Sequence, residues 1–545
     1  MSNSLDIVIT EDDQFKEHYS DIMTKIKKKQ LTEVEPTIDE ITQVYDIITE
    51  FIKEKKRKIY GGYALNKLLI AKNKEFALYD ELDTPDVDFY SPDPINDLVE
   101  ISDRLHKAGL KEVVGQEAQH KETYSIFVNH KGPYCDISYM PNNIYSKVRF
   151  IQLDGFNVVH PWFMMIDYFR MFTDPMNSYW RLEKHFARYL KLQKTYPLPR
   201  INKPLQIPAY KDKGFSKAMN LLFDFMAQRE TTLFTGFYAY NYYLYLSGYH
   251  KYDKSYSYIF MPYLEVYSSD YVNDGMDLIE YIKTLPEEIR TSLSYKEHYP
   301  FFQLYGYNVE IYYNDGNDEI PIMYLYSNNK RCLPFKEVEY VKFDNLNKDK
   351  PEPTNTMSIK IGCFDLNILH VLITLVKVRV DDDNDWNDRL YKLINGYVLF
   401  RNYYLSKKKI TLYDESVFEG FVIQCIGETI APDREARLVM KARKKLGKPI
   451  KWRYQPSGND KKLGKYVFLN SSGNQVNNKR NLRLTEENKN KKWEDDYEDE
   501  ENYDEKESLK GSDSEAESDV ESDNESDNES DNKSDNESES DKESD

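Results

Sequence analysis

Cysteine is scarce in this chain of 545 residues. The four cysteines are widely spaced and form no C-x-x-C pair: Cys135, Cys332, Cys363 and Cys425. Closely paired cysteines mark zinc sites, and a high cysteine density marks small secreted domains held by disulfides. The sequence therefore predicts neither a zinc site nor a disulfide framework, and it indicates a reducing compartment.

Apolar runs long enough to cross a membrane are also missing. A membrane-spanning helix needs ~20 consecutive apolar residues, and the best candidate, NILHVLITLVKV at residues 367–378, is interrupted by Lys377. The N-terminal segment MSNSLDIVITEDDQFKEHYS has no basic stretch followed by an apolar run, so it is not a typical signal peptide. We expect a soluble, intracellular protein with no membrane partner.

Acidic residues are concentrated at the C-terminus. Residues 494–545 contain 26 Asp and Glu against 4 Lys, a net charge of -22, which leaves +3 for the remainder of the chain. The repeat ESDNESDN offers no apolar surface that could offset chain entropy, so we predict a disordered tail. The preceding residues 434–493 are basic and include Trp452 and Tyr454, which suits binding of an RNA backbone. A solubilising linker is the alternative for this basic segment.

The stretch KIYGGYALNKLLIA, residues 58–71, reads as a strand, a Gly-Gly turn and a helix. Glycines let a phosphate approach the free N–H groups at the start of a helix. Gly61 and Gly62 are therefore candidate nucleotide-binding residues, with a purely structural turn as the alternative.

Three aspartates follow in two predicted strands. In TPDVDFYSP, strand alternation places Asp86 and Asp88 on one face. Asp136 lies in the second strand of a hairpin expected around residues 131–133, among largely apolar neighbours. A buried aspartate is costly unless it is paired or binds a metal, and a two-metal site needs a third acidic ligand. We predict that these three residues are metal ligands, with solvated or otherwise satisfied aspartates as the alternative.

A Gly-Gly turn, an Asp-x-Asp pair and a later strand-borne Asp together resemble the nucleotidyltransferases of the DNA polymerase β superfamily. The stretches KIYGGYALN, DVDFYSPDP and TDPMNSYWRLEKHFARYLKLQ are, more narrowly, similar to the poly(A) polymerase catalytic subunits of giant viruses, which are related to those of poxviruses. This resemblance implies transfer of AMP from ATP to an RNA 3′ end, in mRNA polyadenylation. It also implies Mg²⁺ or Mn²⁺ as cofactor, with Asp86, Asp88 and Asp136 as catalytic metal ligands.

The resemblance carries expectations about partners and location as well. It implies the host cytoplasm, in a viral factory, with packaging in the virion as an alternative. Processivity could come from a homodimer or from a separate partner subunit, and the sequence does not decide between them.

A second helix is expected after the break at residues 173–175. On it, basic residues recur at helical spacing and form one stripe: Arg181, Lys184, Arg188 and Lys191. Lys184 and Arg188 are candidate ligands of the ATP phosphates. A solvated helix face is the alternative.

The chain then repeats itself. PYLEVYSSDYVND, residues 262–274, matches PDVDFYSPDPIND, residues 85–97, and GFYAYNYYL matches GGYALNKLL at nearly the same offset. The repeat has Tyr263 at the place of Asp86, Glu265 at that of Asp88, Phe237 at that of Gly62, and an apolar position near Ile322 at that of Asp136. We predict a second unit that keeps the scaffold and cannot hold two metals. Its many tyrosines either pack the core or stack RNA bases: Tyr238, Tyr240, Tyr242, Tyr243 and Tyr245.

The predicted fold is α+β, with two tandem nucleotidyltransferase-like units, each a mixed sheet with flanking helices, the second catalytically degenerate, and a disordered acidic tail. The expected divisions are an N-terminal extension (1–30), an active domain (31–155), a connecting helical region (156–204), a degenerate repeat with a helical end (205–433), the basic segment (434–493) and the tail (494–545). A uridylyl- or CCA-adding enzyme and a non-catalytic RNA-binding scaffold are the alternative functions.

Overall fold

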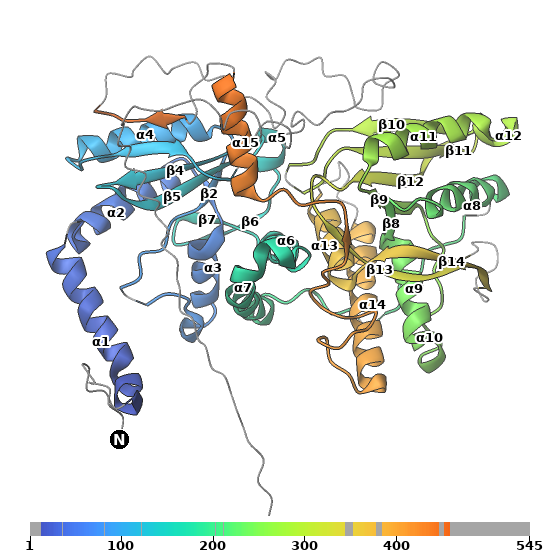
Figure 1. Ribbon diagram of the computed structural model, residues 1–545, viewed down its shortest axis with the longest axis horizontal. Helices are drawn as coiled ribbons and strands as arrows, with labels where there is room; N and C mark the ends of the chain where they lie inside the picture. Colours follow the sequence, from blue (N-terminus) through green and yellow to red (C-terminus); the bar gives the residue numbers. More distant parts are fainter. Residues whose placement is uncertain are drawn as a thin grey trace, which may run out of the picture. The chain divides into compact units, whose positions relative to one another are not determined.

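The computed structural model describes residues 12–457, apart from 35, 81, 121, 202, 211, 303, 344–351, 378–383 and 446–451 (Figure 1). All of the described residues belong to one compact unit, residues 1–491. The predicted acidic tail and most of the basic segment lie outside the described residues. Among the helices that are described, none has the length and apolar character needed to cross a membrane.

The first half of the chain forms a mixed sheet that β16, from residues 453–454, extends at one edge; the eight strands among the described residues have the order β16-β3-β4-β5-β2-β1-β7-β6. The strands are β1 (Lys58–Ile59), β2 (Phe89–Ser91), β3 (Val114–Glu117), β4 (Thr123–Val128), β5 (Lys131–Tyr139), β6 (Phe150–Leu153), β7 (Phe156–Val159) and β16 (Arg453–Tyr454). Strand β1 pairs antiparallel with β2 and parallel with β7, and β2 pairs parallel with β5. Strand β7 extends this sheet beyond residue 155.

Helices flank this sheet. They are α1 (Asp12–Glu33), α2 (Ile38–Glu54), α3 (Gly61–Ile70), the short 3₁₀ helix η1 (Lys74–Phe76), α4 (Pro94–Lys107), α5 (Asn142–Tyr145), α6 (Pro161–Phe172) and α7 (Pro175–Thr195). Helix α2 begins with a capping box, because Thr37 and Glu40 each accept a hydrogen bond from the other's backbone N–H. It buries Ile41, Ile48 and Phe51 at helical spacing. The expected strand, Gly-Gly turn and helix are present as β1 and α3.

The second half forms another mixed sheet, again with eight described strands, in the order β10-β11-β12-β9-β8-β14-β13-β15 (Figure 1). The strands are β8 (Thr232–Thr235), β9 (Leu264–Ser268), β10 (Leu293–His298), β11 (Asn308–Asn314), β12 (Glu319–Ser327), β13 (Leu333–Lys342), β14 (Glu352–Gly362) and β15 (Cys425–Ile426). The helices are α8 (Lys213–Ala227), α9 (Gly236–Ser247), α10 (Tyr249–Tyr252), α11 (Tyr271–Thr284), α12 (Glu287–Arg290), α13 (Phe364–Val376), α14 (Asn384–Lys408) and α15 (Pro432–Lys445).

Seven strands occur in the same spatial order in the two sheets. The order β3-β4-β5-β2-β1-β7-β6 of the first sheet corresponds to β10-β11-β12-β9-β8-β14-β13 of the second. The parallel pairs β1–β7 and β2–β5 have parallel counterparts in β8–β14 and β9–β12. The fold therefore confirms two tandem units of one architecture.

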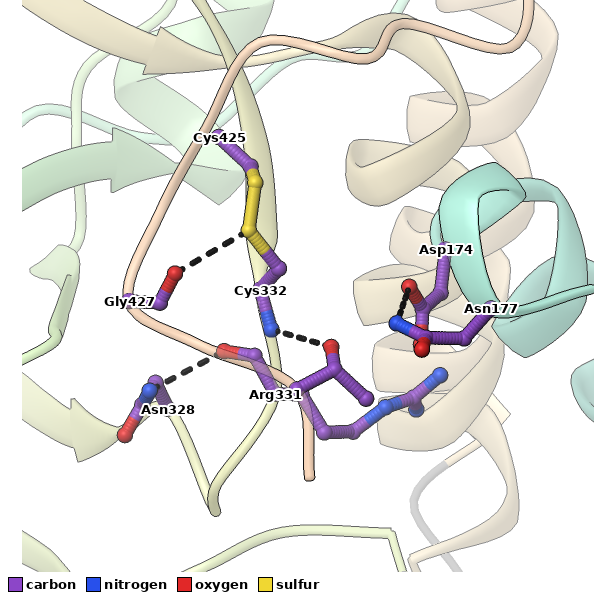
Figure 2. Close-up of a disulfide and its surroundings, with 8 residues drawn as sticks. Asp174, Asn177, Asn328, Arg331, Cys332, Cys425 and Gly427 are labelled. Carbon is purple, nitrogen blue, oxygen red and sulfur yellow. Dashed lines mark hydrogen bonds between the residues drawn. A yellow bond between two sulfur atoms is a disulfide. The ribbon is translucent and has the colours of Figure 1, made fainter. Parts of the chain in front are cut away.

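A disulfide in the second unit contradicts the expectation that no disulfide forms. Cys332, which precedes β13, is bonded to Cys425 of β15, with their Cα atoms 5.5 Å apart (Figure 2). The two positions are separated by 93 residues, so spacing along the chain could not reveal them. The pairing of β13 with β15 brings them together.

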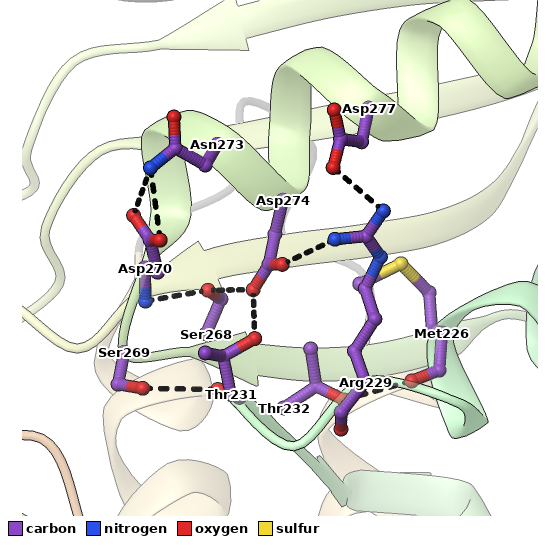
Figure 3. Close-up of polar contacts among 10 residues, drawn as sticks. All are labelled: Met226, Arg229, Thr231, Thr232, Ser268, Ser269, Asp270, Asn273, Asp274 and Asp277. Carbon is purple, nitrogen blue, oxygen red and sulfur yellow. Dashed lines mark hydrogen bonds and ion pairs between the residues drawn. The ribbon is translucent and has the colours of Figure 1, made fainter. Parts of the chain in front are cut away.

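A polar network at the start of one helix is repeated in both units. In the second unit, Asp274 accepts hydrogen bonds from Ser268 (2.5 Å) and Arg229 (2.8 Å) (Figure 3). In the first unit, Asp97 accepts the same bonds from Ser91 (2.5 Å) and Arg57 (2.7 Å). In both units the serine hydroxyl also accepts a hydrogen bond of 2.9 Å from the backbone N–H of the residue two positions later, Asp93 or Asp270. The repeated motif thus holds the turn between strand and helix.

Aromatic residues that were candidates for RNA stacking serve as core instead. Tyr238, Tyr240, Tyr242 and Tyr243 on α9 are each at most 1% exposed, which rules out a base-stacking wall built from these four rings. Trp452 is 4% exposed and packs against a tyrosine of β4 at a ring distance of 5.8 Å.

The start of the basic segment returns to the first sheet. Helix α15 follows β15, and β16 then pairs antiparallel with β3. Arg443 of α15 forms an ion pair with Glu117 of β3, and the hydroxyl of Tyr454 donates a hydrogen bond to Asp103 (2.6 Å). The segment that leaves the second unit is therefore anchored on the first.

Candidate active site

Three carboxylates converge at the ends of neighbouring strands in the first unit. Asp86 and Asp88 lie in the segment directly before β2 rather than within the strand as predicted, and Asp136 lies on β5, which pairs with β2. One carboxylate oxygen of each residue lies within 4.8 Å of those of the other two. Oxygen ligands at this spacing suit a hard divalent cation, so the residues fit the predicted metal site.

The surroundings of these carboxylates disfavour three free negative charges. Partial burial raises the pKa of Asp136 to about 6, against the hydrogen bond of 2.6 Å that Ser125 donates to it. Burial, followed by the charges of Asp86 and Asp136, raises the pKa of Asp88 well above its usual range. Because a bound cation would relieve this repulsion, the site is electrostatically prepared for metal.

The glycine turn directly adjoins the carboxylates. Gly61 has φ of +71°, and a Cβ at this position would overlap with Oδ2 of Asp88. A Cβ on Gly62 would overlap with the hydroxyl of Tyr79 and approach Nη1 of Arg188 to 3.4 Å. Helix α3 therefore begins directly beside both an acidic group and a guanidinium, an arrangement that a side chain would obstruct.

The basic stripe on α7 faces the same place. Burial raises the pKa of Asp86, and the charges of Arg188, Lys184 and Arg181 oppose that rise. Arg188 also donates a hydrogen bond to the Tyr79 hydroxyl (3.2 Å). The structure thus brings the predicted phosphate-binding residues to the glycine turn, where helix N–H groups and cations favour an anion.

The second unit carries different groups at the same places. Strand pairing puts Glu265 at the position of Asp88 and Tyr263 at that of Asp86, as predicted. Phe89 pairs with Ile137, so Asp88 lies opposite Asp136, one residue earlier on each strand. In the second unit Glu265 pairs with Tyr324, which therefore takes the position of Asp136. The predicted position near Ile322 is therefore two residues from the observed one, and both positions lie on the same face of the strand.

The degenerate site satisfies its own polar groups. Nε2 of His370 donates a hydrogen bond to Oε1 of Glu265 (2.8 Å), where the first unit would hold a cation. The N–H of Gly236, at the start of α9, donates to Oδ1 of Asn367 (3.2 Å). Phe237 packs against Tyr263 at a ring distance of 5.3 Å. Side chains thus occupy the places that correspond to the candidate metal and phosphate positions of the first unit.

Several of these groups are not apparent from the sequence. Ser125 and Tyr79 lie outside any motif, and only the strand pairing of β4 with β5 and the approach of α7 to α3 bring them to the site. His370 and Asn367 sit on α13, more than a hundred residues from their partners. A lone polar residue in an apolar helix is the only signal the sequence offers for them.

Comparisons with known proteins agree along most of the chain. Residues 46–178 match the family "Poly(A) polymerase catalytic subunit", and residues 191–486 match "APMV, Putative poly(A) polymerase, catalytic subunit, C-terminal". A "Putative poly(A) polymerase catalytic subunit" of Acanthamoeba polyphaga mimivirus is 32% identical over 487 residues, which are 85% of this chain and 81% of the relative. A protein of the same description from African swine fever virus (isolate Pig/Kenya/KEN-50/1950) is 30% identical over 183 residues, 32% of this chain and 37% of the relative. The crystal structure of the Megavirus polyadenylate synthase superposes with a TM-score of 0.75 at 32% identity, covering 88% of this chain and 95% of that one.

Proposed function

The chain belongs to the family of poly(A) polymerase catalytic subunits, and we propose that its first unit adds AMP from ATP to RNA 3′ ends. It is accordingly a nucleotidyltransferase with RNA and ATP as substrates. The observation that carries the proposal is the convergence of Asp86, Asp88 and Asp136 within 4.8 Å, next to the Gly61–Gly62 turn.

Each residue has a defined task in this proposal. The three aspartates would hold two Mg²⁺ or Mn²⁺ ions, which, when bound, supply an activated 3′ hydroxyl and charge neutralisation at the leaving pyrophosphate. Gly61 and Gly62 leave open the start of α3 for the triphosphate, and Lys184 and Arg188 neutralise its outer phosphates. The acceptor hydroxyl and the α-phosphate would thereby be brought together beside the carboxylates.

The setting of the reaction is also proposed. The relatives are viral proteins, which favours mRNA polyadenylation in the viral factory of the host cytoplasm or in the virion. The domain divisions predicted above, with a catalytic first unit and a degenerate second one, are part of the same proposal. Processivity is proposed to come from a homodimer or from a separate subunit. The mass of the purified protein in solution tests the homodimer.

Extension of a short 3′-hydroxyl RNA tests the reaction. The RNA is incubated with each ribonucleoside triphosphate and with Mg²⁺ or Mn²⁺, beside a variant carrying Asp86→Ala and Asp88→Ala. Long tails with ATP alone, lost in the variant, support the proposal. Extension with UTP or with mixed nucleotides would assign a different terminal transferase, and RNA binding without any extension would assign a scaffold.

A further inference from the structure

The start of α7 exposes large apolar side chains beside the proposed active site. Met176, Tyr179 and Trp180 are 64%, 74% and 64% exposed. Such side chains are usually buried, and three of them within five consecutive positions form a patch. The proposed reaction assigns no role to these three side chains.

This patch continues the basic stripe. Met176, Trp180, Lys184 and Arg188 follow at intervals of four residues, so they form one ridge along the helix. Trp180 lies about 12 Å along the axis from Arg188, by the helical rise of ~1.5 Å per residue. Since Arg188 adjoins the glycine turn, one end of the ridge is basic and lies at this turn, and the other end is aromatic and exposed.

A cation connects the rings to the aspartates. The guanidinium of Arg181 lies 4.0 Å from the centre of the Trp180 ring, and its charge also acts on Asp86. A guanidinium on one face of an indole fixes the ring and leaves its other face available for stacking. It also places positive charge where a nucleic-acid phosphate would pass.

A hollow adjoins the same helix end. Its volume is about 350 Å³, and it is lined by residues 173–177 at the helix start and by Cys332, residues 422–423, Cys425, residues 427–429 and Arg434. Figure 2 shows Asp174 and Asn177 at the helix start facing the segment that carries Cys332. Met176 thus joins the exposed patch to this hollow, whose lining also includes Arg434 of the basic segment.

We propose that Tyr179 and Trp180 are the stacking platform for the 3′-terminal bases of the RNA acceptor, with the strand continuing along the hollow beside Met176. The inference rests on the proposed function, because it assigns these rings to the acceptor of that reaction. An exposed aromatic pair with cations suits single-stranded RNA, whereas the adenine of a bound nucleotide calls for a concave, mostly enclosed pocket.

RNA binding is measured first in a chain made inactive by Asp86→Asn and Asp88→Asn. Fluorescence anisotropy with labelled oligo(A) at fixed salt should show that Tyr179→Ala and Trp180→Ala each raise Kd about 30-fold, the middle of the range for one lost stack. Trp180→Phe should retain most of the affinity. Tyr413→Ala is the matched control, because Tyr413 is 77% exposed on a different segment and should leave Kd unchanged.

The position of the base is then mapped with 2-aminopurine. Its fluorescence at the RNA 3′ terminus should be quenched on binding, and the double alanine variant should lose this quenching, while an internal probe far from the terminus responds equally to both proteins. In the active enzyme, the same variants should raise KM for RNA and leave KM for ATP unchanged.

Other results would overturn the platform. A raised KM for ATP with unchanged RNA affinity would assign the rings to the adenine of the nucleotide, and unchanged values of both would exclude a role in substrate binding. The two proposals fail separately: an intact chain that binds RNA through Trp180 but adds no AMP would refute the polymerase and keep the platform.

Discussion

The first and second units share a strand order and a polar network, and they differ in the groups at one end of the central strands. Asp97 and Asp274 accept the same hydrogen bonds in the two units. Asp88 instead faces other carboxylates, whereas Glu265 faces His370. The network stabilises a turn that any copy of this fold needs, whereas a cluster of acids is unfavourable unless a cation relieves it. A copy without catalysis can therefore lose the acids and must keep the network.

The largest expected effect is common to both units. Asp97→Ala and Asp274→Ala should each reduce the free energy of unfolding by about 3 kcal/mol, because each removes the buried carboxylate that pairs with a largely buried arginine. Chemical denaturation measures the loss. Asp277→Ala is the control: Asp277 also pairs with Arg229 but is 58% exposed, so its loss should cost under about 1 kcal/mol. A loss confined to one unit would contradict the structural role of the repeated network.

The glycine of the turn should separate the two units by activity. Gly61→Ala forces a Cβ against Asp88 at φ of +71° and should lower kcat about 100-fold through misplacement of the carboxylates. Gly236→Ala meets Glu265 at φ of +61° and should lower Tm without changing the kcat of the folded enzyme. Steady-state extension assays and thermal melts report the two effects. A loss of kcat in Gly236→Ala would show that the second unit takes part in chemistry.

Removing one acid charge should change stability with opposite sign in the two units. The pKa of Asp136 is raised to about 6, so its contribution to stability is present at low pH and is lost as pH rises through 6. Asp136→Asn should therefore raise the Tm of the metal-free protein at pH 7.5 by about 2–4 °C and have no such effect near pH 4. Glu265→Gln should lower Tm, because it weakens a charge-assisted hydrogen bond with His370. Calorimetry at both pH values, with and without Mg²⁺, tests this, and equal signs would refute it.

The smallest effect concerns one lysine on a helix of each unit, Lys184 on α7 and Lys392 on α14. Lys184→Ala should raise KM for ATP about 10-fold, the value expected for one lost charge-assisted bond. Lys392→Ala should leave KM unchanged, because Lys392 is ion-paired with Asp388 (2.5 Å) on its own helix. An unchanged KM in Lys184→Ala would remove this residue from the nucleotide site.

How well the sequence predicts a site residue depends on the distance along the chain between that residue and its partners. The Gly-Gly turn, Asp86 and Asp88 lie within 30 residues of one another, and their spacing reveals a strand, a turn and a common face. The sequence indicates Asp136 because it is an acidic residue in a largely apolar predicted strand. Its counterpart was placed two residues from Tyr324, because sequence matching cannot fix the register of a parallel pair whose strands are far apart in the chain.

The sequence by itself determined the duplication, the three aspartates and the loss of two of the three acids in the second unit, since each depends on residue type and local spacing. Only the tertiary structure decided which groups occupy the candidate metal and phosphate positions there, that Cys332 pairs with Cys425, and that Trp452 packs into the first sheet. It alone also placed Arg181 over the exposed ring of Trp180, with its charge acting on Asp86. These contacts join residues that are distant in the chain, and their geometry exists only once strand order and helix packing are fixed.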